Sequence, residues 1–204
     1  MVDLTKITEP LSFDRFVPRS GGPLVLELDL TEGVVDEGPQ NPVSQVLNRR
    51  KQRYLDVLTG VRRGARDPKV AALLVRVDAR SLGLGQVQEL RDTILDFRAT
   101  GKPAVAWADA FGEAGDGNLP YYLACAFSQI VMSPTGVLGL SGLMSRQAFF
   151  KGATDKLGVH FEVGKRHEYK NALNSYTETG YTDAHREAVE AVVDSLSNQL
   201  VTGV

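Results

Sequence analysis

Residues 120–142, PYYLACAFSQIVMSPTGVLGLSG, form the stretch from which the fold is predicted. Pro120 suits the first turn of a helix, where its missing N–H would have no partner anyway. We therefore expect a buried helix over Tyr121–Phe127. The apolar run Ile130–Met132 then predicts a buried strand, which the turn signal SPTG at residues 133–136 ends.

Glycine recurs at every third position near the end of this stretch, at Gly136, Gly139 and Gly142. The spacing indicates a tight path of strand and turn, in which side chains would obstruct the approach of neighbouring backbone. A helix start beside glycine-rich backbone can collect N–H groups for an anion or an oxyanion. The pattern therefore marks a candidate site without naming its ligand.

Further strands and helices alternate on both sides of this stretch. Strands are predicted at residues 24–30, 70–77, 104–108 and 159–163, from alternating or continuous apolar residues. Helices are predicted from about Arg49, around residues 87–97, over residues 146–157 and after Thr182. This succession predicts a loose N-terminal arm at residues 1–22 and a single α/β domain with a mostly parallel sheet over residues 23–204.

Composition excludes several classes of function. A net charge of −2 argues against a nucleic-acid partner, which favours a strongly basic surface. Cys125 is the only cysteine, so no intrachain disulfide can form, and the three histidines lack the spacing of a zinc site. We expect no metal and no cofactor. The sequence contains no apolar run of 18 or more residues and no signal peptide, so we expect the chain as given to be soluble.

Two patterns have simpler interpretations than binding sites. The basic cluster at residues 49–53 is explained by one solvated helical turn. Gly83-x-Gly85 lacks the remaining residues of a nucleotide-binding loop, so a plain turn is favoured. The glycine-rich, acidic segment 111–119 is different, because loops of this kind beside rigid elements often cover active sites.

The chemistry on offer reduces to one lysine. No paired carboxylates, no Gly-x-Ser-x-Gly turn and no Cys/His pairing stand out in the sequence. Lys170 lies in EYKNAL, residues 168–173, and a desolvated lysine can act as a general base for a serine nucleophile. Lys165 and Arg166 could add positive charge nearby. The alternative is a solvated surface lysine, since lysine is rarely buried.

Several segments together resemble the signal peptide peptidase A (protease IV) family. They are residues 24–30, 70–77, 103–108, 121–124, 130–142 and the YKNA segment at 169–172. The resemblance implies an α/β fold of the ClpP/crotonase type, a superhelix of β-β-α units. Long members of the family contain two tandem halves, of which the N-terminal half supplies a lysine general base and the C-terminal half the serine. Lys170 stands at the position of that lysine.

Departures from the family pattern indicate which half this chain resembles. Where the nucleophile-bearing half reads Ser-Gly-Gly-Tyr-Tyr, this chain has Asn118-Leu119-Pro120-Tyr121-Tyr122, and an asparagine cannot attack a peptide bond. The Ser-Pro-Gly-Gly turn that supplies oxyanion-hole backbone is replaced by DARS at residues 78–81. His167 replaces a usual glycine. We therefore expect the N-terminal portion of a longer protein, inactive by itself.

The leading hypothesis is half of a serine–lysine peptidase that degrades signal peptides or membrane-proximal peptides. Its expected partners are a peptide substrate, a serine-bearing C-terminal half and further copies of itself as a homo-oligomer, with membrane association implied by the resemblance. Tyr169 and Asn171 could orient Lys170. The alternatives are a non-catalytic oligomerisation scaffold, a crotonase-type acyl-CoA enzyme, or a self-contained pair of Lys170 with a local serine. The candidate serines are Ser141, Ser145 and Ser175.

Overall fold

The computed structural model of the protein describes residues 22–36, 51–113 and 115–204. Two compact units divide the chain, a first unit, Met1–Ser141, and a second unit, Gly142–Val204. The arm predicted at residues 1–22 lies almost wholly outside the described residues. A single domain over residues 23–204 stays a prediction, and each unit is described here by itself.

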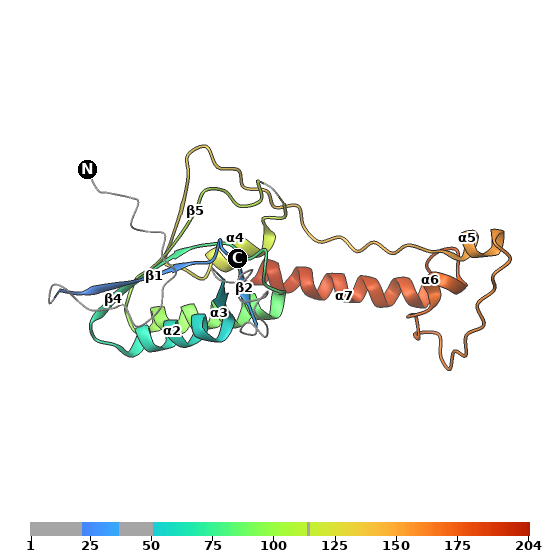
Figure 1. Ribbon diagram of the computed structural model, residues 1–204, viewed down its shortest axis with the longest axis horizontal. Coiled ribbons are helices and arrows are strands. Elements are labelled where there is room, and N and C mark those ends of the chain that lie inside the picture. Colours follow the sequence, from blue (N-terminus) through green and yellow to red (C-terminus); the bar gives the residue numbers. More distant parts are fainter. Residues whose placement is uncertain (1–21, 37–50, 114) are drawn as a thin grey trace, which may run out of the picture. The chain divides into compact units, whose positions relative to one another are not determined.

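A four-stranded parallel sheet organises the first unit (Figure 1). Its strands, in spatial order, are β1 (Leu24–Asp29), β4 (Val70–Arg76), β5 (Ala104–Ala108) and β6 (Gln129–Met132). A parallel two-stranded sheet pairs β2 (Val34–Val35) with β3 (Gln52–Arg53). The predicted α/β class with a parallel sheet, the architecture of the ClpP/crotonase type, is confirmed.

Among the described residues of the first unit, three helices accompany the sheet: α2 (Tyr54–Arg66), α3 (Leu84–Ala99) and α4 (Asn118–Ala124). Helices α2 and α3 lie side by side along one face of the sheet (Figure 1). Asp67 ends α2 in an extended conformation, because the following Pro68 disfavours helical backbone before it. The predicted start of α2 near Arg49 falls outside the described residues, and the helix begins at Tyr54.

The core lies between these two helices and the sheet. Alternate strand residues face the helices and are buried, whereas their neighbours on the opposite face, such as Trp107, are half-buried. Burial over Val70–Arg76 therefore alternates. The continuous apolar run at residues 70–77 is typical of a strand buried on both faces, but among the described residues of the first unit α2 and α3 cover one face of the sheet. The buried residues facing the helices, and those of the helices themselves, are Leu26, Leu28, Leu73, Val75, Ala104, Ala106, Val57, Leu58, Val61, Val87, Leu90, Ile94 and Phe97.

The segment that predicted the fold agrees with the structure in order but not in burial. Helix α4 is buried at Tyr122 and Leu123, as expected, although it begins at Asn118 and ends at Ala124. Strand β6 follows it, but Ile130 is 36% and Val131 44% exposed. The prediction of a buried strand is wrong because β6 is the edge of the sheet, paired with β5 alone among the described strands.

The second unit consists of α5 (Lys151–Lys156), the single turn α6 (Asn174–Thr177) and the long α7 (Asp183–Thr202). Thr182 caps α7 as predicted, since its hydroxyl accepts a hydrogen bond from the His185 N–H at 3.3 Å. The predicted helix over 146–157 shortens to α5, and the predicted strand over 159–163 is absent from this fully described unit. Both errors concern apolar residues without a surface to pack against; Leu157, for example, is 78% exposed.

Helix length and composition bear on membrane insertion. Within the part of the chain that the structure describes, no helix is both long enough and apolar enough to cross a bilayer.

Candidate functional site

Lys170 lies on an exposed segment of the second unit, between α5 and α6. Its backbone N–H donates to the His167 carbonyl at 3.2 Å, and the Asn171 N–H donates to the Tyr169 carbonyl at 3.0 Å. These bonds fold the chain tightly around the lysine. The ammonium itself has no hydrogen-bond or ion-pair partner within residues 142–204. Lys170 is therefore an exposed amine on a tightly turned segment of backbone.

The residue before Lys170 contacts α7. The Tyr169 hydroxyl donates a hydrogen bond to Glu187 Oε2 at 2.7 Å. This hydrogen bond, reinforced by the negative charge of Glu187, raises the pKa of the Tyr169 phenol above its usual value. Tyr169 is a candidate to orient Lys170, but its hydroxyl is directed to the helix rather than to the ammonium.

The residues after Lys170 also contact α7, through a buried amide. Asn174 is 1% exposed, and its Nδ2 lies 3.3 Å from Asn171 Oδ1 and 3.3 Å from His185 Nδ1. Lys165 donates to Asn174 Oδ1 at 2.5 Å and forms an ion pair with Glu178 at 3.2 Å. The charge that Lys165 was expected to lend Lys170 is thus already paired. Asn171, the other expected orienter, bonds to Asn174.

Aromatic rings enclose the His185 side of this network. His185 is 4% exposed, and its ring meets those of Tyr181 and Phe149 edge-on, with centroids 4.8 and 6.2 Å apart. The sequence did not indicate this cluster. Only the polar residues Asn174 and His185 are buried in a unit whose apolar residues are largely exposed, and nothing in their spacing predicts that they meet.

No hydrogen bond among the described residues joins Lys170 to any of the three candidate serines. Ser175 Oγ accepts a hydrogen bond from Gln147 Nε2 at 2.6 Å, and Ser145 is exposed without a side-chain hydrogen bond in the second unit. In the first unit, Ser141 donates to Asp116 Oδ1 at 3.3 Å. The self-contained pair gains no support from the described contacts.

Three backbone donors at the glycine-lined start of α4 are bonded within the chain. The Gly117 N–H donates to the Gly139 carbonyl at 3.1 Å, the Gly139 N–H to the Phe111 carbonyl at 2.7 Å, and the Asn118 N–H to Asp116 Oδ1 at 2.9 Å. A Cβ on Gly117 would lie 2.5 Å from the Phe111 carbonyl oxygen. The glycines therefore permit a close crossing of backbone. An anion site at this helix start stays a prediction, with these three N–H groups already bonded within the chain.

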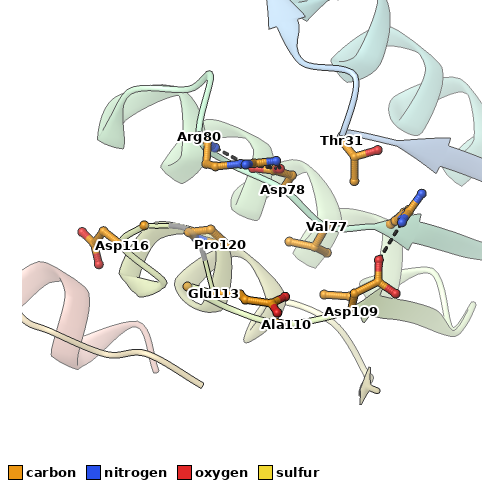
Figure 2. Close-up of a pocket in the computed structure, with 13 residues that line it drawn as sticks. Thr31, Val77, Asp78, Arg80, Asp109, Ala110, Glu113, Asp116 and Pro120 are labelled. Atoms are coloured by element: carbon orange, nitrogen blue, oxygen red, sulfur yellow. Dashed lines mark hydrogen bonds and ion pairs between the residues drawn. The ribbon is translucent and has the colours of Figure 1, made fainter. Parts of the chain in front are cut away.

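A pocket of about 240 Å³ opens at the carboxyl ends of the first unit's strands (Figure 2). Arg76 Nη2 donates to Asp109 Oδ2 at 2.6 Å across it. The acidic segment 111–119 supplies Gly112, Glu113, Gly115 and Asp116 to the lining, so that segment borders this pocket. That it covers an active site stays a prediction. Sequence analysis missed the pocket, although charged residues directly after parallel strands are a signal for one.

The turn at residues 78–81 lines the same pocket through Asp78 and Arg80. Asp78 Oδ1 accepts from the Arg80 N–H at 2.8 Å, and its Oδ2 accepts from Arg80 Nε at 2.8 Å. The backbone donor at this turn is thus occupied by the chain's own carboxylate. No group of three or more His, Cys, Asp or Glu side chains among the described residues could hold a metal ion.

Comparison with known proteins finds relatives among peptidases. A stretch of 142 residues, 70% of this chain, is 28% identical to "Serine protease SPPA, chloroplastic" of Arabidopsis thaliana, and 176 residues, 80% of the chain, are 24% identical to "Protease 4" of Salmonella typhi. The chain spans only 20% and 27% of the length of these relatives. The family model "Peptidase family S49" matches residues 96–204, a range that contains α4, Lys170 and α7. Since this match covers more than half of the chain, the protein belongs to peptidase family S49.

Proposed function

We propose that this chain supplies Lys170 as the general base of a serine–lysine peptidase, and that the serine comes from a C-terminal half outside this chain. The observation that carries the proposal is the exposed ammonium of Lys170, unpaired within the second unit, on a segment bonded on both sides to α7. Membership of a peptidase family, and a relative named as a serine protease, support it.

The proposed reaction needs Lys170 as a neutral amine. Its Nζ takes the proton from the serine hydroxyl as the serine oxygen attacks the carbonyl carbon of the scissile peptide bond. The resulting ammonium returns that proton to the leaving amine, and an acyl-enzyme remains. Water then attacks the ester and gives a proton to Lys170. The Lys170 ammonium returns a proton to the serine oxygen as the C–O bond breaks and the acid product leaves. Desolvation by the covering half would favour the neutral amine.

Three features of this chain support a serine from elsewhere. Asn118 occupies the nucleophile position, and neither Ser145 nor Ser175 bonds to Lys170. The Arg80 N–H, at the place of the family's oxyanion turn, is already bonded to Asp78. A second chain segment must therefore bring both the nucleophile and the donors that stabilise its oxyanion.

The second unit also offers surface for partners. Its exposed apolar side chains would be covered by the serine-bearing half and, in a homo-oligomer, by further copies of the protein. The proposed substrates are signal peptides or membrane-proximal peptides, with the protein close to a membrane, as the resemblance implies. The large exposed residues are Leu143, Met144, Phe150, Leu157, Val159, Phe161, Leu173, Tyr176, Val192 and Val201.

The test uses the protein that joins this chain to its serine-bearing half. Lys170→Ala should lower kcat for peptide cleavage by about 10²- to 10⁴-fold, because general-base catalysis contributes that much. Lys170→Arg should be equally inactive, since a guanidinium stays protonated. In the 204-residue chain the unfolding midpoint should stay nearly unchanged in both variants, because the Lys170 side chain is exposed there.

Two controls accompany these variants. Lys156→Ala removes another exposed lysine of the same unit and should leave activity intact. The 204-residue chain by itself should neither cleave peptides nor react with a fluorophosphonate probe. Retained cleavage by Lys170→Ala or Lys170→Arg would return Lys170 to the surface-lysine interpretation and favour the scaffold hypothesis.

A further inference from the structure

We propose that α7 positions Lys170 through two hydrogen-bonded contacts, one on each side of it in sequence. Tyr169 and Glu187 form the first contact, and Asn174 with His185 forms the second. These four are positioning residues, because each acts through the backbone that carries Lys170. Their catalytic meaning rests on the proposed function of Lys170 as the base.

The first contact fixes the residue that directly precedes the lysine. The Tyr169 hydroxyl reaches Glu187 Oε2 at 2.7 Å, a short bond of the kind that an ionised acceptor makes. Glu187 lies two residues beyond His185 on α7, and side chains two apart on a helix point in different directions. The two contacts therefore reach α7 from different sides, and rotation of the segment about one contact is opposed by the other.

The second contact has a single consistent arrangement of donors. The Lys165 ammonium has only protons to give, so Asn174 Oδ1 must face it and accept. Asn174 Nδ2 then points to Asn171 Oδ1 and His185 Nδ1, and it donates to both. His185 must accept on Nδ1, which places the proton of the neutral ring on Nε2. A buried network with each member satisfied favours one geometry.

Lys170 needs such support because its own side chain has none in the second unit. A lysine stem is flexible, and a base misplaced by about 1 Å can cost on the order of 10² in rate. The unit buries no apolar side chain that could fix residues 169–174 by packing. The two contacts to α7 are thus the interactions on which the placement of the lysine backbone depends.

The activity test again uses the protein joined to its serine-bearing half. Tyr169→Phe and Glu187→Ala should each lower kcat between about tenfold and 10²-fold with KM nearly unchanged. Glu187→Gln keeps an acceptor for the Tyr169 hydroxyl and should recover most of the lost kcat. Glu190→Ala removes the same charge from an exposed position three residues further along α7, and it should behave as wild type.

A second readout, on the same joined protein, needs no catalysis. An endoproteinase that cleaves after lysine should cut after Lys170 about fivefold faster in Tyr169→Phe and Glu187→Ala, because loss of one hydrogen bond raises the open population by that factor. Cleavage after Lys170 should not change in Glu190→Ala. Asn174→Ala does not serve as a test, because the Asn174 side chain is buried and its removal can unfold the segment.

The outcomes separate the two proposals. Full kcat in Tyr169→Phe and Glu187→Ala, beside an inactive Lys170→Ala, would overturn positioning by α7 and leave the general base intact. Full activity in Lys170→Ala would overturn the proposed function and the positioning role with it. Unchanged cleavage after Lys170 in both Tyr169→Phe and Glu187→Ala would also overturn the positioning role, because the contacts to α7 would then not order the segment.

Discussion

Arg91 illustrates how single residues join the elements of the first unit. Its side chain is buried on α3, its Nη1 donates to the Tyr122 carbonyl, and its guanidinium lies 4.0 Å from the centroid of the Tyr122 ring. A buried charge is tolerated only with such partners. Arg91 therefore ties α3 to the short helix α4, whose position the sequence alone could not give.

Cys125, directly after α4, allows a test of burial by its titration. Burial raises the pKa of its thiol, although the Tyr121 hydroxyl and the Arg91 charge oppose that shift. At pH 8 the native chain should therefore react with iodoacetamide more slowly than the unfolded chain, because it holds less thiolate and restricts access. Equal alkylation rates in the native and unfolded states would contradict this.

The same shift makes stability depend on pH. Because the folded thiol binds its proton more tightly than the unfolded one, this contribution is fully present below the unfolded pKa of about 8.5. It is lost as pH rises from there through the raised pKa of the folded thiol. Cys125→Ser should flatten the fall in unfolding free energy in that alkaline range, which urea titrations at several pH values would measure.

Helix α2 is closed at its C-terminal end by a lysine from outside the helix. Lys102 Nζ donates to the backbone carbonyls of Gly64, Ala65 and Asp67 at 2.9, 2.9 and 2.7 Å. Carbonyls at a helix end lack partners within the helix, and a cation there also complements the helix dipole. The Asp67 carbonyl additionally accepts from the Val70 N–H at 3.1 Å. Lys102 begins the approach to β5, so this side chain joins α2 to the next strand of the sheet.

Removal of that ammonium should destabilise the first unit. Lys102→Met keeps the apolar stem and should cost about 1–3 kcal/mol of unfolding free energy, as expected for hydrogen bonds to a charged group. The midpoint of urea unfolding measures the loss. Lys69→Met is the matched control, because Lys69 is exposed beside the same helix end and should stay within about 0.5 kcal/mol of wild type.

Elements with a strong local pattern were predictable from sequence, and those that depend on a partner surface were not. Apolar residues alternate over Leu24–Leu30 and line one face of a helix over Val87–Phe97. The first unit buries both sets of side chains, and both elements were predicted correctly. Residues 159–163 have apolar side chains but do not form a strand in the second unit. A sequence pattern indicates which side chains favour burial, but it does not indicate which surface covers them. The Asn174–His185 contact joins positions eleven residues apart and leaves no periodic signal.

The two units of the molecule differ in what stabilises them. The first encloses an apolar core between α2, α3 and the sheet, whereas the only buried residues of the second are Asn174 and His185. Folding of a chain segment requires apolar burial to offset its conformational entropy. The second unit lacks that burial by itself, which fits a region that the proposed serine-bearing half covers.

A peptide of residues 142–204 should therefore not fold cooperatively. Its circular dichroism should show partial helix from α7 and a broad thermal change without a sigmoidal transition, because helices in proteins are stabilised mainly by packing of an apolar face, which α7 lacks within this unit. The 204-residue chain should show one cooperative transition, which the first unit supplies. A sharp melt of the isolated peptide would contradict the account of the second unit given above.

Trp107 gives the pocket of the first unit its own optical signal. It is the only tryptophan of the chain, it lies on the face of the sheet opposite α2 and α3, and the Arg76 guanidinium stands 4.7 Å from its ring centroid. Arg76 also lines the pocket and pairs with Asp109. A molecule that enters the pocket and draws Arg76 away changes the field at one indole, so fluorescence emission reports occupancy without any label.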